Sequence, residues 1–142
     1  MKVKFSNEVT FIPTWKGNDT ATEANQFRVI VKPLEMNDLI DLLDVLGSVD
    51  KDKLASVGDE PSEENAKEAL DQSKEMLKQC GHLVPKYCKV ENLEGENGPV
   101  SIQDVVTYPF FMQLSIEILM QMAVISMPTE TDEKNSDQQP AS

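Results

Sequence analysis

Both cysteines and the only histidine of this 142-residue chain lie within one short stretch, "CGHLVPKYC", residues 80–88. Cys80, His82 and Cys88 are the side chains there that could bind zinc or carry out thiol chemistry. Zinc takes four protein ligands in a structural site and three in a catalytic one, so a fourth would have to be a carboxylate such as Glu91. The spacing C-x-H-x5-C matches no strong zinc pattern. We therefore expect a helix end and a connector, with no metal and no cofactor.

A catalytic site is not indicated either. A nucleophilic arrangement of the Ser-His-Asp or Cys-His kind would have to use His82. The sequence contains no G-x-S-x-G motif, phosphate loop, dinucleotide fingerprint or H-E-x-x-H motif. The many acidic residues are more simply explained as solvated helix faces. We expect no catalytic residue and no enzymatic activity.

The charge of the chain is strongly acidic, with 25 acidic against 13 basic residues and a net charge of -12. Arg28 is the only arginine, and the planar fork of arginine is the usual group for phosphate recognition. Nucleic acids and anionic membranes are therefore disfavoured as partners. The N-terminal stretch "MKVKFSNEVTF" lacks the apolar run of a signal peptide, so we expect a cytoplasmic protein without a Cys80–Cys88 disulfide.

Two segments near the N-terminus alternate apolar and polar residues, as half-buried strands do. Their apolar positions are Val3, Phe5, Val9 and Phe11 in the first segment and Phe27, Val29 and Val31 in the second. Pro33 lacks a backbone donor and ends the second segment. The pattern predicts an antiparallel β-hairpin with a long loop over residues 13–26. Such a hairpin is marginal alone and must pack on the rest of the chain.

The remainder reads mostly as helix. Helices are predicted from Asn37 to Gly47 and from Ser62 to Gly81, and Ser101 with Asp104 resembles a capping pair. The segment "VPKYCKVENLEGENGP" is predicted to be extended and turn-like. We therefore predict a single α+β domain over residues 1–128, with the β-hairpin (1–33) packed on a helical region (37–127). Residues 129–142, acidic and almost without apolar side chains, are predicted to be a disordered tail.

The segment from Pro109 to Met127 is predicted to form one helix that is apolar nearly all round. Gln113, Glu117 and Gln121 form a thin polar stripe at a spacing of four. Three interpretations remain open: a membrane span, which Glu117 at mid-span and acidic flanks disfavour; a core helix; and a partner site with adaptable methionines. The residues assigned to the partner site are Phe110, Phe111, Leu114, Met120, Met122 and Met127.

The stretch "LVPKYCKVENLEGENGPVSIQDVVTYPFFMQLSIEILMQM" resembles the tail assembly chaperones of long-tailed bacteriophages. The matching features are an extended stretch over residues 87–93, glycines at 95 and 98, a helix start over residues 100–105, and Pro109, Phe110 and Leu114 at the opening of an apolar helix. The strand-then-helix segment "FRVIVKPLEMNDLIDLL" is also similar to phage tail proteins. Residues 13–26 and 48–61 have no counterpart in that pattern.

The resemblance implies a non-enzymatic chaperone in the host cytoplasm. Such a protein binds the phage tape measure protein and keeps this aggregation-prone helical rod soluble until tail tube subunits polymerise around it. The tail tube protein and a further copy of the chain are additional candidate partners. Two alternatives stand beside it: a structural subunit of a phage tail or neck, which would form rings or tubes, and a small enzyme or metal protein centred on His82.

Overall fold

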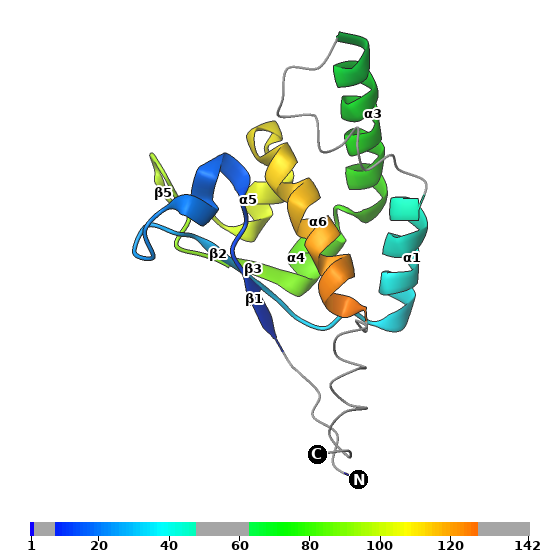
Figure 1. Cartoon of the computed structure of the whole chain (residues 1–142), viewed down its shortest axis with the longest axis horizontal. Helices are drawn as coiled ribbons and strands as arrows, with labels where there is room; N and C mark the ends of the chain where they lie inside the picture. The colour runs from blue at the N-terminus through cyan, green and yellow to red at the C-terminus, as the bar shows by residue number, and fades with distance from the viewer. Residues whose placement is uncertain (2–7, 48–62, 128–142) are drawn as a thin grey trace, which may run out of the picture.

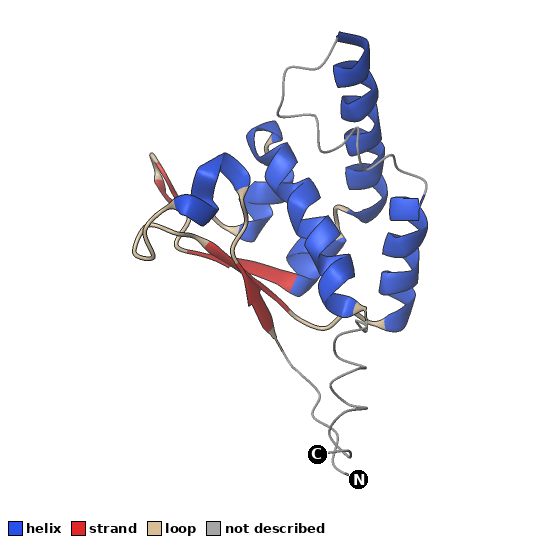
Figure 2. Ribbon diagram, in the orientation of Figure 1, coloured by secondary structure: helices blue, strands red, loops and turns tan. Residues whose placement is uncertain are grey.

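The computed structural model describes residues 1, 8–47 and 63–127 of the chain. Its architecture is mixed helix and strand with a small antiparallel sheet (Figures 1 and 2). Three strands form this sheet in the order β1-β2-β3. They are β1 (Val9–Phe11), β2 (Arg28–Val31) and β3 (Cys88–Glu91).

The middle strand, β2, shows why the alternating pattern produces a half-buried sheet. Val29 and Val31 are buried, whereas Ile30 between them is only partly buried. Val31 lies opposite Val9 on β1 and opposite Cys88 on β3, and both pairings are antiparallel. The apolar side of β2 therefore faces the core.

The third strand confirms part of the extended segment that the sequence predicted, but its pairing with β2 was not predicted. The region of residues 37–127, expected to be helical, contains β3 and a second, two-stranded sheet of β4 (Glu94–Gly95) and β5 (Gly98–Pro99). Residues 2–7 of the expected first strand and the predicted tail, residues 129–142, lie outside the described residues.

The helices gather around the apolar helix α6. Helix α6 (Met112–Ser126) packs on α1 (Met36–Gly47), α3 (Glu63–Cys80), α4 (Leu83–Tyr87), α5 (Ile102–Thr107) and the 3₁₀ segment η1 (Trp15–Thr20). Figure 1 shows α6 between the sheet and the pair α1 and α3. A second 3₁₀ segment, η3 (Pro109–Phe111), directly precedes α6. Side chains from every layer meet in one core, including Val29, Leu42, Met76, Val84, Val105, Leu119 and Met122.

Two local predictions about helices can be compared directly with the structure. The capping box at α5 is confirmed: the Ser101 hydroxyl accepts from the Asp104 N–H at 3.2 Å, and the Ser101 N–H donates to Asp104 Oδ2 at 3.1 Å. The single helix over residues 109–127 is corrected, because the chain forms η3 first and α6 starts at Met112. Tyr108, which precedes Pro109, is extended at ψ 133°, as residues before proline prefer.

The segment after α3 was predicted to be a connector, and the structure corrects this as well. Leu83, Val84 and Tyr87 lie on α4 and are buried in the core. Pro85 is the third residue of this short helix, where its missing N–H removes no intrahelical hydrogen bond. The proline therefore shapes the first turn of α4 and does not prevent the helix.

Candidate protein-binding surface

The two cysteines that suggested chemistry are packed into the core. Cys80 ends α3 and Cys88 starts β3, and both are buried free thiols. Burial raises the pKa of the Cys88 thiol to about 12, and burial together with Asp41 raises the pKa of Cys80. A buried thiol with a raised pKa carries little thiolate at neutral pH and reacts poorly. Within residues 1, 8–47 and 63–127, no group of three His, Cys, Asp or Glu side chains could hold a metal ion.

A polar network near this segment fixes the start of α1. Lys86 Nζ donates to Asp38 Oδ2 at 2.8 Å, and the Tyr87 hydroxyl donates to the same oxygen. The Glu35 N–H in turn donates to the Tyr87 hydroxyl oxygen at 3.2 Å. Hydrogen bonds from Lys86 and Tyr87 lower the pKa of Asp38. The network joins α1 to α4, and so sets the direction in which α1 leaves the sheet.

Helix α6 combines a buried side with exposed apolar residues near its end. Within the described part of the chain, Pro109–Ser126 is the one segment long and apolar enough to cross a membrane, and 39% of it is buried inside the protein. One side of α6 is core and carries Leu114, Ser115, Ile116, Ile118, Leu119, Met122 and Ala123. The opposite side of α6 is covered by η1 along the first half of the helix, whereas along the second half it is exposed to solvent.

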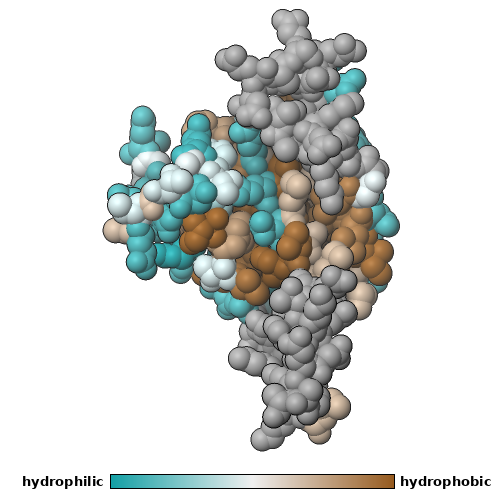
Figure 3. Space-filling model, viewed as in Figure 1, coloured by the Kyte–Doolittle hydropathy of each residue, from teal (hydrophilic) through white to brown (hydrophobic). Residues whose placement is uncertain are grey.

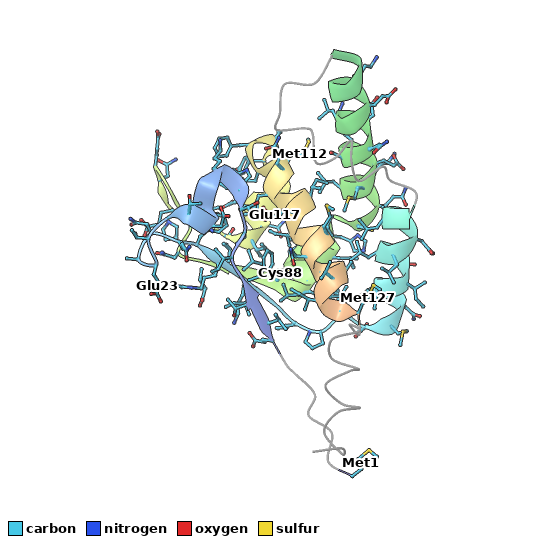
Figure 4. All side chains as sticks on the ribbon, in the orientation of Figure 1. Met1, Glu23, Cys88, Met112, Glu117 and Met127 are labelled. Atoms are coloured by element: carbon cyan, nitrogen blue, oxygen red, sulfur yellow. The ribbon has the colours of Figure 1, made fainter. Side chains whose placement is uncertain are left out.

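The first half of α6 is covered because Glu117 binds η1. Its carboxylate accepts from the Thr14 N–H at 2.7 Å, the Thr14 hydroxyl at 3.1 Å and the Trp15 N–H at 3.1 Å. These N–H groups lie at the start of η1, where a helix has donors without intrahelical partners. Figure 4 shows Glu117 on α6 where the helix passes η1. The one acidic residue of the helix is thereby used inside the fold.

An aromatic ledge, defined as Trp15, Phe110 and Phe111, lies beside this contact. The Trp15 ring centroid is 5.6 Å from that of Phe110 and 5.5 Å from that of Phe111. Lys16 Nζ lies 5.0 Å from the centroid of Phe110 and 5.3 Å from that of Trp15, within the range of cation–π interactions. Phe110 is nevertheless 64% exposed, so the ledge presents an aromatic ring to solvent.

The second half of α6 is open and adjoins α1. We define a methionine face as Met36 and Ile40 of α1 with Met120, Val124 and Met127 of α6 and its end. Met36 is 71% exposed, Ile40 47%, Val124 60% and Met127 45%, whereas Met120 is partly buried. The two helices are in contact, and in Figure 1 the start of α1 lies beside the end of α6. Figure 3 shows apolar surface over both helices on this side of the molecule.

The partner residues predicted from the sequence separate into three environments. Leu114 and Met122 are fully buried, which corrects their assignment to a binding surface, because their sides of α6 face the core. Met120 and Phe111 are partly buried and pack against the core. Phe110 is on the aromatic ledge, in η3 before the start of α6, and Met127 is on the methionine face, at the end of α6.

Sequence reasoning missed the contribution of α1 to this surface. Met36 and Ile40 are four residues apart and so share one side of α1, a signal that was present in the sequence. The burial of Leu42 and Leu46 shows which side of α1 faces the core. Val124 could not be distinguished from its neighbours, because α6 is apolar on nearly every side.

Comparisons with known proteins assign no family to this chain. A scan against protein-family models, a search of the curated proteins and a search of the solved structures each found no match. A function is therefore inferred from the surfaces described above and from the resemblance of the sequence pattern.

Proposed function

We propose that this chain is a non-enzymatic tail assembly chaperone of a long-tailed bacteriophage. It binds the tape measure protein in the host cytoplasm and keeps it soluble while the tail tube assembles. In this proposal the chain forms one domain over residues 1–128, in which an N-terminal β-hairpin packs on the helical region. An acidic tail, residues 129–142, follows as a disordered extension.

The observation that carries the proposal is the open second half of α6. Val124 and Met127 are exposed beside the exposed Met36 and Ile40, so apolar surface from two helices lies together. Exposed contiguous apolar surface on a soluble domain is typical of a docking site. Methionine side chains are flexible and polarisable, and so adapt to varied apolar partners. A long helical client offers a surface that such a face can hold, as in helix-in-groove recognition.

The acidic character of the chain fits the same role. A net charge of -12 favours solubility of the chain and of a complex that contains it. A chaperone for an aggregation-prone rod needs an apolar face for the client and a charged remainder that repels other complexes. Both features occur here, since the methionine face is apolar and other elements expose acidic side chains, among them Asp71, Glu75, Glu91, Glu94 and Glu96.

Co-expression with the tape measure protein tests the proposal. The wild-type chain should keep the tape measure protein in the soluble fraction, and the double variant Ile40→Gln with Val124→Gln should leave most of it insoluble. Gln113→Ala is the matched control, because Gln113 is exposed on the same helix but lies at its other end. Circular dichroism should show that all three chains fold.

The proposal fails if the wild-type chain leaves the tape measure protein insoluble. It also fails if the purified chain alone forms rings or long polymers in light scattering, which would favour a structural subunit of the tail or neck. Equal protection by the wild type and the double variant would exclude the methionine face as the client surface.

A further inference from the structure

The charges carried by the two helices of the methionine face are of one sign. Neither α1 nor α6 contains a lysine or an arginine, whereas α1 contains three aspartates. Asp38 is occupied by Lys86 and Tyr87. Asp41 and Asp44 are exposed, and no salt bridge of either is seen among the described residues. The two helices that form the face therefore present free negative charge and no positive charge.

Helix geometry places one of these charges in line with the apolar side chains. Met36, Ile40 and Asp44 follow one another at intervals of four, so they form a row along α1. Asp41 lies on a different side of α1, close enough to the buried Cys80 of α3 for its charge to raise the pKa of that thiol. An apolar segment lying along Met36 and Ile40 would therefore meet Asp44 at the end of the row.

We propose that the methionine face binds a basic amphipathic helix. The apolar side of this helix would lie on Ile40, Val124 and Met127, and a lysine or arginine side chain at its edge would reach Asp44. The inference rests on the proposed function and adds to it the charge of the client segment. A helix is the fitting shape, because the face is built from two packed helices whose ridges accept a third.

A second copy of this chain is the other occupant that the surface could take, and its charge argues against it. A symmetric dimer would bring the same patch of each copy together. Each α1 would then place Asp44 near the acidic α1 of its partner, with no lysine or arginine on α1 or α6 to neutralise it. Like charges across an interface disfavour association, and each chain already carries a net charge of -12.

Two synthetic helical peptides provide the test. Both carry the same leucine and alanine side on the helix, and the flanking positions are lysine in one peptide and glutamate in the other. Fluorescence anisotropy with the full chain should give about two- to fivefold tighter binding for the lysine peptide, as expected for one exposed charge pair. Added salt should reduce that ratio, because it screens exposed charges.

Variants separate the two parts of the surface. Asp44→Asn should weaken binding of the lysine peptide a few-fold and reduce its salt dependence. Asp41→Asn removes the same charge from the α3 side of α1 and should change both less. Ile40→Gln with Val124→Gln should weaken binding while the salt dependence remains, and Gln113→Ala should bind as the wild type does. Analytical ultracentrifugation of the wild-type chain should show no dimer at the concentrations used.

Equal affinity for the two peptides would overturn the inference, as would a dimer that the Ile40→Gln and Val124→Gln double variant dissociates. Either of these two results can occur while the chain still keeps the tape measure protein soluble in co-expression. In that case the inference of a basic client helix fails and the proposed chaperone function stands. If the lysine peptide binds as expected but the tape measure protein stays insoluble, the proposed function fails and the basic-helix site stands.

Discussion

The two halves of α6 have nearly the same composition and different surroundings. In the first half, Glu117 binds Thr14 and Trp15, and the Trp15 ring packs beside Phe110 and Phe111. In the second half, Val124 and Met127 face solvent next to α1. An apolar sequence alone therefore does not determine which part of a helix the fold covers.

One polar side chain explains much of the difference. A partly buried carboxylate is stable only when donors satisfy it, and the start of η1 supplies backbone N–H groups together with the Thr14 hydroxyl. This contact brings the loop and its tryptophan over the first half of α6. Val124 and Met127 contain no group that could recruit a loop by hydrogen bonding. Their apolar surface remains open to a partner.

The strongest test of this contrast places a charge on each side of the same helix. Met122→Asp should destabilise the fold by about 4 kcal/mol or more, because Met122 is fully buried and a carboxylate there has no partner. Val124→Asp should change stability by no more than about 0.5 kcal/mol, as surface substitutions usually do. Urea denaturation measures both. Similar losses for the two variants would show that the second half of α6 is core.

Removal of the Glu117 carboxylate should destabilise only the contact between η1 and the first half of α6. Glu117→Ala should cost about 1 to 3 kcal/mol, because it leaves the N–H groups of Thr14 and Trp15 without their acceptor. Amide hydrogen exchange should accelerate at these two residues. Gln113→Ala, on the same polar stripe but exposed, is the control. Unchanged exchange at Thr14 and Trp15 would mean that other contacts hold η1 in place.

The smallest expected effect concerns the hydrogen-bond network of Asp38, Lys86 and Tyr87, which positions α1 beside the exposed second half of α6. Asp38→Asn should lower the Tm at pH 7, since the variant loses the ion pair with Lys86. The pKa of Asp38 is lowered in the folded state from its ordinary value of 3.8. The ionised carboxylate therefore stabilises the fold at pH values above 3.8, and this stabilisation is lost as the pH falls through the lowered pKa. The difference in Tm between the wild type and Asp38→Asn should therefore become smaller at acid pH. Asp41→Asn, exposed on the same helix, is the control, and a difference that stays constant with pH would contradict the assignment.

Local sequence signals predicted the elements that depend on neighbouring residues. The alternation of Phe27, Val29 and Val31 matches their burial, and the pair Ser101 and Asp104 forms the expected capping box. Both signals span only a few residues, and their physics is local. The extended stretch around residues 88–91 was also anticipated, but its pairing with β2 was not, because strand pairing depends on contacts far apart in sequence.

The candidate surface was harder to predict for the same reason. Glu117 stood out in the sequence as a polar residue in an apolar helix, yet its partners Thr14 and Trp15 lie 103 and 102 positions away. Nothing in the periodicity of α6 distinguishes the buried Met122 from the exposed Val124, since apolar residues occur all round the helix. Only the packing of α1 and η1 shows which side remains open.

Methyl NMR of methionine-labelled protein tests the central claim, that the open half of α6 together with α1 is the binding surface. Addition of the lysine-flanked peptide should shift the methyl signals of Met36, Met120 and Met127. The signals of Met76, which is fully buried, and of Met112, at the first half of α6, should stay in place. Shifts at Met112 without shifts at Met36 and Met127 would place the partner on the aromatic side and contradict the account.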